Sequence, residues 1–335
     1  MKNGILALGA MLLLGVNTQA NASTTVCVFD LLGKSGEAYK VMEEWALTAK
    51  TWRADVRLVS YQSEAQAEND FEQGKCDGVY MTSMRARRYN KFAGSVDAIG
   101  AVPSYAIAQK AISFALDQRN QRRLTSTVGH QVYEVVGISQ IGLAYIFVKD
   151  KKMNTIEQIK GKKFAVLAYD EAQKIVVKSL GGQAVLSDIS DIAKKFNHGQ
   201  ADIMAAPAYA YKPLELYKGL GNEGAIITFP AVNMTMDLII RPEKFSSNFG
   251  QNSRTWFLNR LNNNFALIQK IETELPAKYK INLNNEDKIR YQQILREARI
   301  GLTKRGIYDA NMMNVLKRAR CTVERTNFEC TLGGE

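Results

Sequence analysis

The side chains best suited to bind a ligand follow short apolar runs that are typical of parallel strands. In open α/β sheets, ligands bind in the crevice just beyond the carboxyl ends of such strands. The loops at those ends are 30–35, 61–63, 81–85, 169–171, 187–190 and 206–211. The candidate ligand-binding residues, from these loops and from the segments that connect the strands, are Asp30, Lys34, Ser35, Tyr61, Met81, Thr82, Ser83, Arg85, Tyr145, Tyr169, Asp170, Pro207, Tyr209 and Asn233.

Arg85 and a set of tyrosines define the chemistry expected of this site. Arg85 lies close to the end of the third predicted strand, where a guanidinium can contact an anionic group. Flat apolar area with a polar tip, a common binding surface, is offered by Tyr145, Tyr169, Tyr209 and Tyr211. For each tyrosine taken singly, packing in the core or on the surface remains the alternative.

The segment 33–36 offers a second way to contact an anion. It lies between a predicted strand and a predicted helix, so backbone N–H groups at a helix start face the cleft. Val28 occupies the position where a phosphate-binding loop requires glycine, so the segment does not match that motif. An ordinary turn is the alternative.

Other kinds of site have little support in the sequence. The segment 219–224 spells G-x-G-x-x-G but precedes a strand and opens no helix, which is the wrong context for a dinucleotide. His130 and His198, the two histidines, are far apart, and no catalytic motif stands out. We therefore expect no cofactor, no metal and no enzymatic activity. An enzyme that uses Asp30 or Asp170 in the cleft is the less favoured alternative.

The N-terminus has the features of a signal peptide. Lys2 precedes an apolar stretch at 5–16, and an A-x-A cleavage site ends at Ala22, so residues 1–22 are expected to be removed. The apolar stretch is shorter than the roughly 20 residues that span a bilayer. No later run approaches that length, so we expect a periplasmic protein that does not itself span a membrane. An uncleaved anchor is the alternative.

Composition limits the classes of partner. The 335-residue chain is 46% hydrophobic and 23% charged, which indicates a globular protein, and its length indicates two domains. The formal charge is +11, which loss of Lys2 lowers by one. This basic balance favours a polar or anionic ligand through the long-range field. Nucleic acid is not an expected partner, because the protein is exported and no recognition module is visible.

An internal repeat predicts the architecture. The pattern F-x-x-G-x-small-D occurs at 71–77 and again at 196–202, each time between a helix end and a strand. Strands alternate with helices before both copies, which indicates two parallel or mixed α/β sheets. Separate connecting strands are expected at 140–148, 225–229 and 236–241. The expected fold is therefore a bilobed α/β molecule with a cleft and a helical C-terminal region.

The pattern also predicts domain boundaries and disulfides. One lobe comprises residues 23–139 with about 236–262, the other comprises 140–235, and a helical region at about 263–335 braces both. Export permits disulfides, and four cysteines allow three pairings. We favour Cys27–Cys76, near the starts of two adjacent strands, and Cys321–Cys330, around a short loop. Four reduced buried thiols are the alternative.

The residues around the second repeat resemble those of a known family. The run 155–166, Thr-Ile-Glu-Gln-Ile-Lys-Gly-Lys-Lys-Phe-Ala-Val, resembles the t-x-e-D-L-K-G-k-k-i-R-v segment of TRAP-type (DctP-like) binding proteins. The runs 199–202 and 74–80 resemble their G-x-x-D elements. The whole chain resembles the AdeT group of solute-binding proteins, sometimes labelled RND-type efflux components linked to antibiotic resistance. The resemblance implies a type II periplasmic-binding-protein fold and delivery of a solute to membrane transporter subunits.

The chain departs from this family at two places. Family members typically carry an arginine that grips a substrate carboxylate at the position of Ala165, and a polar residue follows their second G-x-x-D strand, where this chain has Ala205–Ala208. We expect a monomer that binds a small polar or anionic solute between its lobes for a TRAP-like transporter. The alternative is an envelope accessory protein, associated with efflux, that acts through a protein partner.

Overall fold

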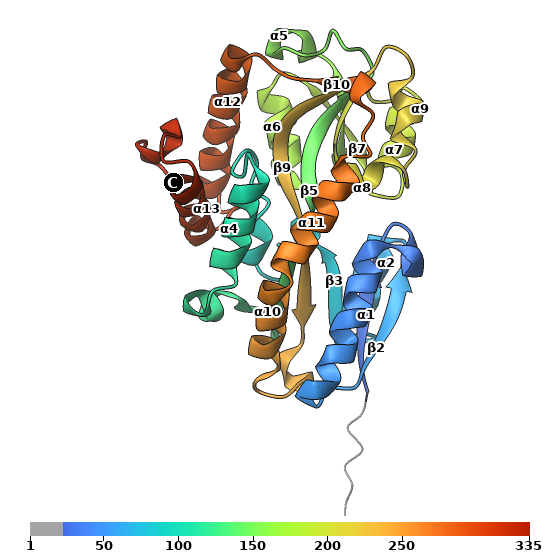
Figure 1. Cartoon of the computed structure of the whole chain (residues 1–335), viewed down its shortest axis with the longest axis vertical. Helices are drawn as coiled ribbons and strands as arrows, with labels where there is room; N and C mark the ends of the chain where they lie inside the picture. Colours follow the sequence, from blue (N-terminus) through green and yellow to red (C-terminus); the bar gives the residue numbers. More distant parts are fainter. Residues whose placement is uncertain (1–22) are drawn as a thin grey trace, which may run out of the picture.

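A computed structural model describes residues 23–335, and the predicted signal peptide lies outside this range (Figure 1). The strands form one mixed ten-stranded sheet in the order β2-β1-β3-β9-β5-β8-β6-β7, with β4 paired to β5 and β10 paired to β9. The predicted mixed α/β fold is confirmed. The prediction of two separate sheets is wrong for the described residues, because two long strands carry one sheet through the molecule.

The first strand group consists of three parallel strands, β1 (Thr24–Phe29), β2 (Val56–Tyr61) and β3 (Gly78–Thr82), with β1 in the middle. Its helices are α1 (Glu37–Ala49), α2 (Glu64–Glu72) and the short α3 (Ser83–Ala86). Helix α2 begins where the sequence supplies a cap, since the Ser63 side chain accepts a hydrogen bond from the Gln66 N–H.

The second strand group repeats this order with β6 (Lys163–Leu167) between β7 (Gln183–Ser187) and β8 (Ile203–Pro207). Its helices are α5 (Ile156–Ile159), α6 (Glu171–Ser179), α7 (Ile192–Asn197), α8 (Ala208–Tyr211) and α9 (Leu216–Leu220). Asp170 caps α6 by accepting a hydrogen bond from the Ala172 N–H.

The internal repeat has the same structural role in both groups. Asp77 and Asp202 each accept a hydrogen bond through Oδ2 from the backbone N–H at the start of the central strand, from Thr25 at 2.8 Å and from Lys163 at 2.9 Å. The glycine of each copy ends a helix with a left-handed backbone, φ 75° at position 74 and 73° at 199. The repeat is therefore a duplicated helix-to-strand turn tied to its own sheet.

Two antiparallel strands join the groups: β5 (Gln131–Val148) and β9 (Ala225–Ile240). The C-terminal part of β9 pairs with β3 of the first strand group, and the C-terminal part of β5 pairs with β8 of the second. Three register shifts interrupt the β5–β9 pairing, and one of them lies beside Gly142, whose φ is 133°. The short strands β4 (Thr125–Val128) and β10 (Lys280–Ile281) extend the long pair.

The remaining helices brace the sheet. They are α4 (Tyr105–Ala115), α10 (Phe249–Asn259), α11 (Leu261–Glu272), α12 (Asn285–Lys304) and α13 (Ala310–Val323). Helices α10 and α11 pack on β5, α12 packs on α6, and α13 packs on α4 (Figure 1). The expected helical C-terminal region is present, and α12 reaches the second strand group directly.

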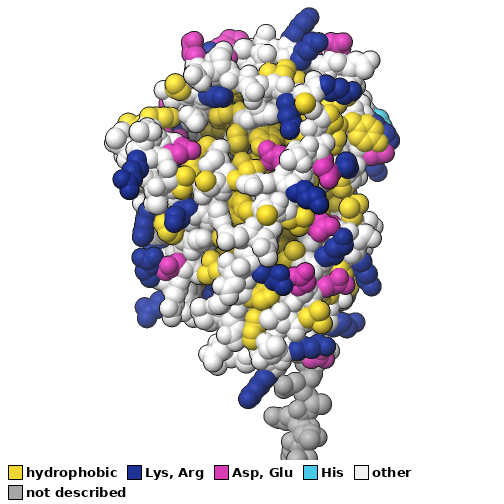
Figure 2. Space-filling view, in the orientation of Figure 1, with side chains coloured by type: hydrophobic (Ala, Val, Ile, Leu, Met, Phe, Trp, Pro, Cys, Tyr) yellow, Lys and Arg dark blue, Asp and Glu magenta, His cyan; other side chains and the backbone are white. Residues whose placement is uncertain are grey.

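Both favoured disulfides are present, Cys27–Cys76 and Cys321–Cys330. On the face shown in Figure 2, lysine and arginine are spread among acidic side chains and apolar surface. None of the helices within residues 23–335 is both long enough and apolar enough to cross a membrane.

Candidate functional site

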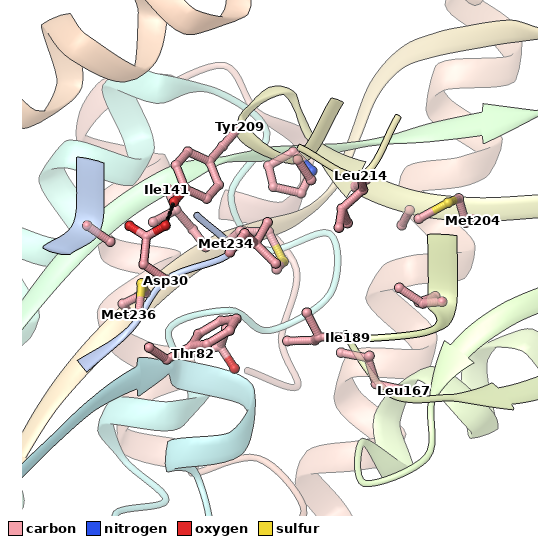
Figure 3. A pocket seen from close by; sticks show the side chains of 18 residues that line it. Asp30, Thr82, Ile141, Leu167, Ile189, Met204, Tyr209, Leu214, Met234 and Met236 are labelled. Carbon is pink, nitrogen blue, oxygen red and sulfur yellow. Dashed lines mark hydrogen bonds between the residues drawn. The ribbon is translucent and has the colours of Figure 1, made fainter. Parts of the chain in front are cut away.

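The first cavity lies where the ends of β1 and β3 face the ends of β6 and β8, and its volume is about 80 Å³ (Figure 3). Three polar side chains line it, Asp30, Thr82 and Tyr209. Most of its wall is apolar and includes Ile141, Leu167, Ile189, Met204, Leu214, Met234 and Met236. A cavity therefore lies at the strand ends, and its lining is largely hydrocarbon and thioether.

Asp30 is the charged group of this lining, and only 1% of its surface is exposed. Its Oδ1 accepts hydrogen bonds from the Tyr209 hydroxyl at 2.7 Å and the Leu32 N–H at 2.9 Å, and its Oδ2 accepts one from the Tyr39 N–H at 3.1 Å. Glycine is required at position 36, since a Cβ there would lie 1.7 Å from Asp30 Oδ1. Burial raises the pKa of Tyr209, so its hydroxyl stays protonated and acts as the donor in the hydrogen bond to Asp30.

The second cavity adjoins the first and has a volume of about 130 Å³. It lies between β6, β9, α6 and α12, with Met84 and Ile99 contributed from the first part of the chain. Its lining is apolar apart from Gln173 and the Tyr291 hydroxyl, and it includes Ala165. The side chains that line both cavities, and so stand between them, are Leu167, Ile192, Ala205 and Met234.

Arg85 joins the two strand groups next to these cavities. Its Nε and Nη1 donate to Glu64 at 2.9 Å and Glu68 at 2.6 Å, and its Nη2 donates to Asp188 of the second group at 3.0 Å. The ring of Tyr169 lies 3.8 Å from the guanidinium, and its hydroxyl donates to Glu64 at 3.0 Å. Burial raises the pKa of Glu64, an effect that Arg85 opposes. Arg85 is thus fully occupied by acidic and aromatic partners.

Arg87 makes a second ionic bridge between the groups. Its Nη1 donates to Asp170 at 3.1 Å, while Nη2 donates to the buried Asp97. With Arg85–Asp188, Tyr169–Glu64 and Tyr209–Asp30, this bridge makes a set of four polar contacts between the strand groups, which we call the cross-contacts. They connect the two strand groups directly in the described conformation.

The fourteen candidate residues fall into three sets. Four of them line the first cavity: Asp30, Thr82, Pro207 and Tyr209. Arg85, Tyr169 and Asp170 belong to the cross-contacts, to which Asp30 and Tyr209 also contribute. Lys34 is exposed, and Ser35 lines a third cavity of about 380 Å³ that shares Tyr209 with the first. The others have partners elsewhere: Tyr61 with Asp70, Ser83 with Asp237, Tyr145 with Glu272, Asn233 with Val96, and Met81 in the core.

Sequence reasoning missed most of the apolar lining. Alternation along β9 contained a usable signal, because Met234 and Met236 share one face and line the first cavity. Asn233, Thr235 and Asp237 point to the other face, where the last two engage Ser83 through hydrogen bonds. Selecting the polar residue of this strand therefore selected the face that turns away from the cavity.

Residues 23–335 contain no group of three or more His, Cys, Asp or Glu side chains arranged to hold a metal ion.

Comparison with known proteins identifies the family. A family described as "Solute-binding protein AdeT 1/2" matches residues 42–335. The chain belongs to this AdeT family of solute-binding proteins. It is 44% identical over 308 residues to "Probable solute-binding protein AdeT1" of Acinetobacter baumannii, a match that covers 92% of this chain and 100% of the relative.

Solved structures of TRAP periplasmic solute-binding proteins share the fold of this AdeT-family chain. A protein from Ralstonia eutropha H16 with bound (S)-2-acetolactate has a TM-score of 0.71 and 12% identity, covering 90% of this chain and 99% of that one. A protein from Desulfovibrio salexigens with bound orotic acid has a TM-score of 0.68 and 13% identity, with the same coverage. At such identities the likeness establishes the fold.

Proposed function

We propose that this AdeT-family protein captures a small solute between its two strand groups in the periplasm and delivers it to a membrane transporter. The observation that carries the proposal is the pair of adjoining cavities, whose walls come from both groups. The first cavity lies at the carboxyl ends of the parallel strands, the ligand position in open α/β sheets, and the second adjoins it along β6. Structural neighbours with the same fold hold small organic acids.

Solute capture involves movement of two lobes about the long strands. In this proposal the lobes are residues 23–139 with about 236–262, and residues 140–235, braced by the helical region at about 263–335. The register shifts of β5 and β9, including the one at Gly142, are the points where the shared sheet bends most easily. Opening requires the four cross-contacts to separate, and a ligand that touches both lobes favours closure.

Thermal unfolding of the purified protein tests this function, after carried-over ligand has been removed by unfolding and refolding. The panel contains organic acids, sugars, amino acids and uncharged apolar compounds. A ligand at 100 times its Kd adds about 2.7 kcal/mol, which for a chain of this length is a rise of about 4 °C in Tm. Unchanged curves across the panel would refute small-solute capture and favour the protein-partner alternative.

Two matched variants locate the site. Tyr209→Phe removes the hydroxyl that donates to Asp30 in the first cavity, whereas Tyr61→Phe removes a similar tyrosine–aspartate bond, to Asp70, away from both cavities. We expect Tyr209→Phe to change the affinity for a panel ligand severalfold and Tyr61→Phe to leave it unchanged. Equal effects of the two variants would place binding elsewhere.

A further inference from the structure

We propose that the solute is uncharged, elongated and mainly apolar, and that one molecule spans both cavities. This inference rests on the proposed function and specifies the class of solute. It replaces the polar or anionic solute expected from the net charge of the chain. Three features carry it: the charge of the lining, the hydrogen-bond partners of the nearby arginines, and the adjacency of the two cavities.

The lining offers no cation to an acid. Among the described residues that line either cavity, Asp30 is the one charged side chain, and it is negative. A carboxylate solute placed in the first cavity would therefore lie near a buried anion and lose its own hydration, which is unfavourable on both counts. An uncharged solute avoids both costs.

The arginines nearest the cavities are already neutralised. Arg85 uses Nε and both Nη atoms on Glu64, Glu68 and Asp188, and it is 7% exposed. Arg87 uses its three nitrogens on Asp97, Asp170 and the Gly94 carbonyl oxygen. To bind an acid, Arg87 would have to leave a buried carboxylate without its partner, and Arg85 would have to give up at least its bridge to the partly exposed Asp188.

The two cavities are adjacent, and both have mainly apolar walls. Ala205 lines both and is the exposed residue of the otherwise buried strand β8, so open space lies beside its methyl group. Met234 also stands between the cavities, and its unbranched thioether side chain adapts readily to a ligand. An apolar cavity of about 150 Å³ holds a benzene ring. The adjoining pair suits a longer molecule, with a chain or two rings in place of one.

One end of the solute has a defined polar partner. A carboxylate has about four lone-pair positions, and Asp30 uses three of them on Tyr209, Leu32 and Tyr39. The remaining position can accept one hydrogen bond from a hydroxyl or amide in the first cavity. The solute class is therefore an amphipathic neutral compound, such as a medium-chain alcohol or amide, whose apolar part extends into the second cavity.

The test compares 1-octanol with octanoate at pH 8, using calorimetry and thermal unfolding of the refolded protein. We expect 1-octanol to bind at least tenfold more tightly than octanoate. Octanoate binding as tightly as 1-octanol, or binding by small polar acids alone, would overturn the inference while leaving solute capture intact. Failure of every compound in the broader panel would instead refute the proposed function.

A matched pair of variants tests whether the ligand spans both cavities. Ala205→Leu fills the space between the cavities, whereas Ala184→Leu adds the same group to an exposed position of β7, which is separated from β8 by β6. We expect Ala205→Leu to weaken 1-octanol binding at least tenfold and Ala184→Leu to leave it unchanged. Unchanged binding in Ala205→Leu would overturn the inference. Ala165→Val, which narrows the second cavity alone, provides the same test if Ala205→Leu does not fold.

Discussion

If the space beside Ala205 is empty in the unliganded protein, filling it stabilises the fold. Ala205→Val adds two carbon atoms between the cavities, and a β-branched residue suits its strand position. Burying two methyl groups contributes about 1.6 kcal/mol at about 0.8 kcal/mol each. We expect about 1 kcal/mol after part of this gain is lost to fixing the side chain and to the open side of the cavity.

Ala184→Val is the control, because Ala184 is also exposed in a strand of the same sheet but lies outside both cavities. With an unfolding entropy of about 2.1 cal/mol/K per residue, 1 kcal/mol corresponds to a rise of about 1.5 °C in Tm. Urea unfolding of refolded protein measures the same difference as a free energy. If Ala205→Val is no more stable than Ala184→Val, or is less stable than wild type, the space is filled in solution and the reasoning fails.

Three further perturbations test the rest of the structure. Asp188→Asn breaks the Arg85–Asp188 bridge at a partly exposed carboxylate, so we expect a stability change below about 1 kcal/mol but a larger radius of gyration by small-angle X-ray scattering; an unchanged radius would contradict a role in closure. Burial raises the pKa of Asp237 to about 7. The native state therefore keeps a proton that the unfolded chain releases above about pH 4, and stability falls as the pH rises from about 4 to about 7. In urea unfolding, the stability of Asp237→Asn relative to wild type should be higher at pH 8 than at pH 4. A stability difference that does not depend on pH would contradict this. Replacing Cys27 and Cys76 by alanine opens a loop with a sequence separation of 49 residues. The expected loss of stability is about 4 kcal/mol, measured by urea unfolding, and a loss below about 1 kcal/mol would count against it.

The repeat was predictable because it depends on local backbone requirements. A glycine with positive φ at the end of a helix, followed by an aspartate that accepts a hydrogen bond from its own sheet, leaves a short pattern in the sequence. The two strand groups and both disulfides follow from such local patterns and from strand adjacency. The strand order of each group repeats because each repeat builds the same turn.

The single sheet was not predictable in the same way. Strand β9 was expected as two strands, at 225–229 and 236–241, with Pro230 between them. Strand β9 continues through Pro230 because the pairing of β5 with β9 shifts there. Ile146 pairs with Ile227, whereas Ala144 pairs with Val232. Residues 228–231 thus have no register partner on β5, and a missing proline N–H costs no ladder bond there. Such long-range pairing leaves no local signal.

Several predicted site residues lie at the junction of the strand groups, where their partners are other side chains of the protein. Position in the sequence placed Arg85, Tyr169 and Asp170 at strand ends, and the structure brings all three to the junction of the strand groups. The sequence alone could not predict which acidic side chains pair with Arg85, because Glu64, Glu68 and Asp188 come from other elements. The charge of a binding site depends on such pairings more than on net charge.

The cross-contacts also determine how a solute would gain its affinity. Because Arg85, Arg87 and Tyr209 are satisfied by partners within the protein, closure needs no polar group from a ligand. A solute can then add mainly apolar contact, and each buried methylene contributes about 0.8 kcal/mol, which is roughly a fourfold change in Kd. Across a series of 1-alkanols we expect Kd to fall about fourfold per methylene until both cavities are full, and then to stop falling. Calorimetry measures this profile, and a Kd independent of chain length would show that a polar group, rather than the apolar wall, holds the solute.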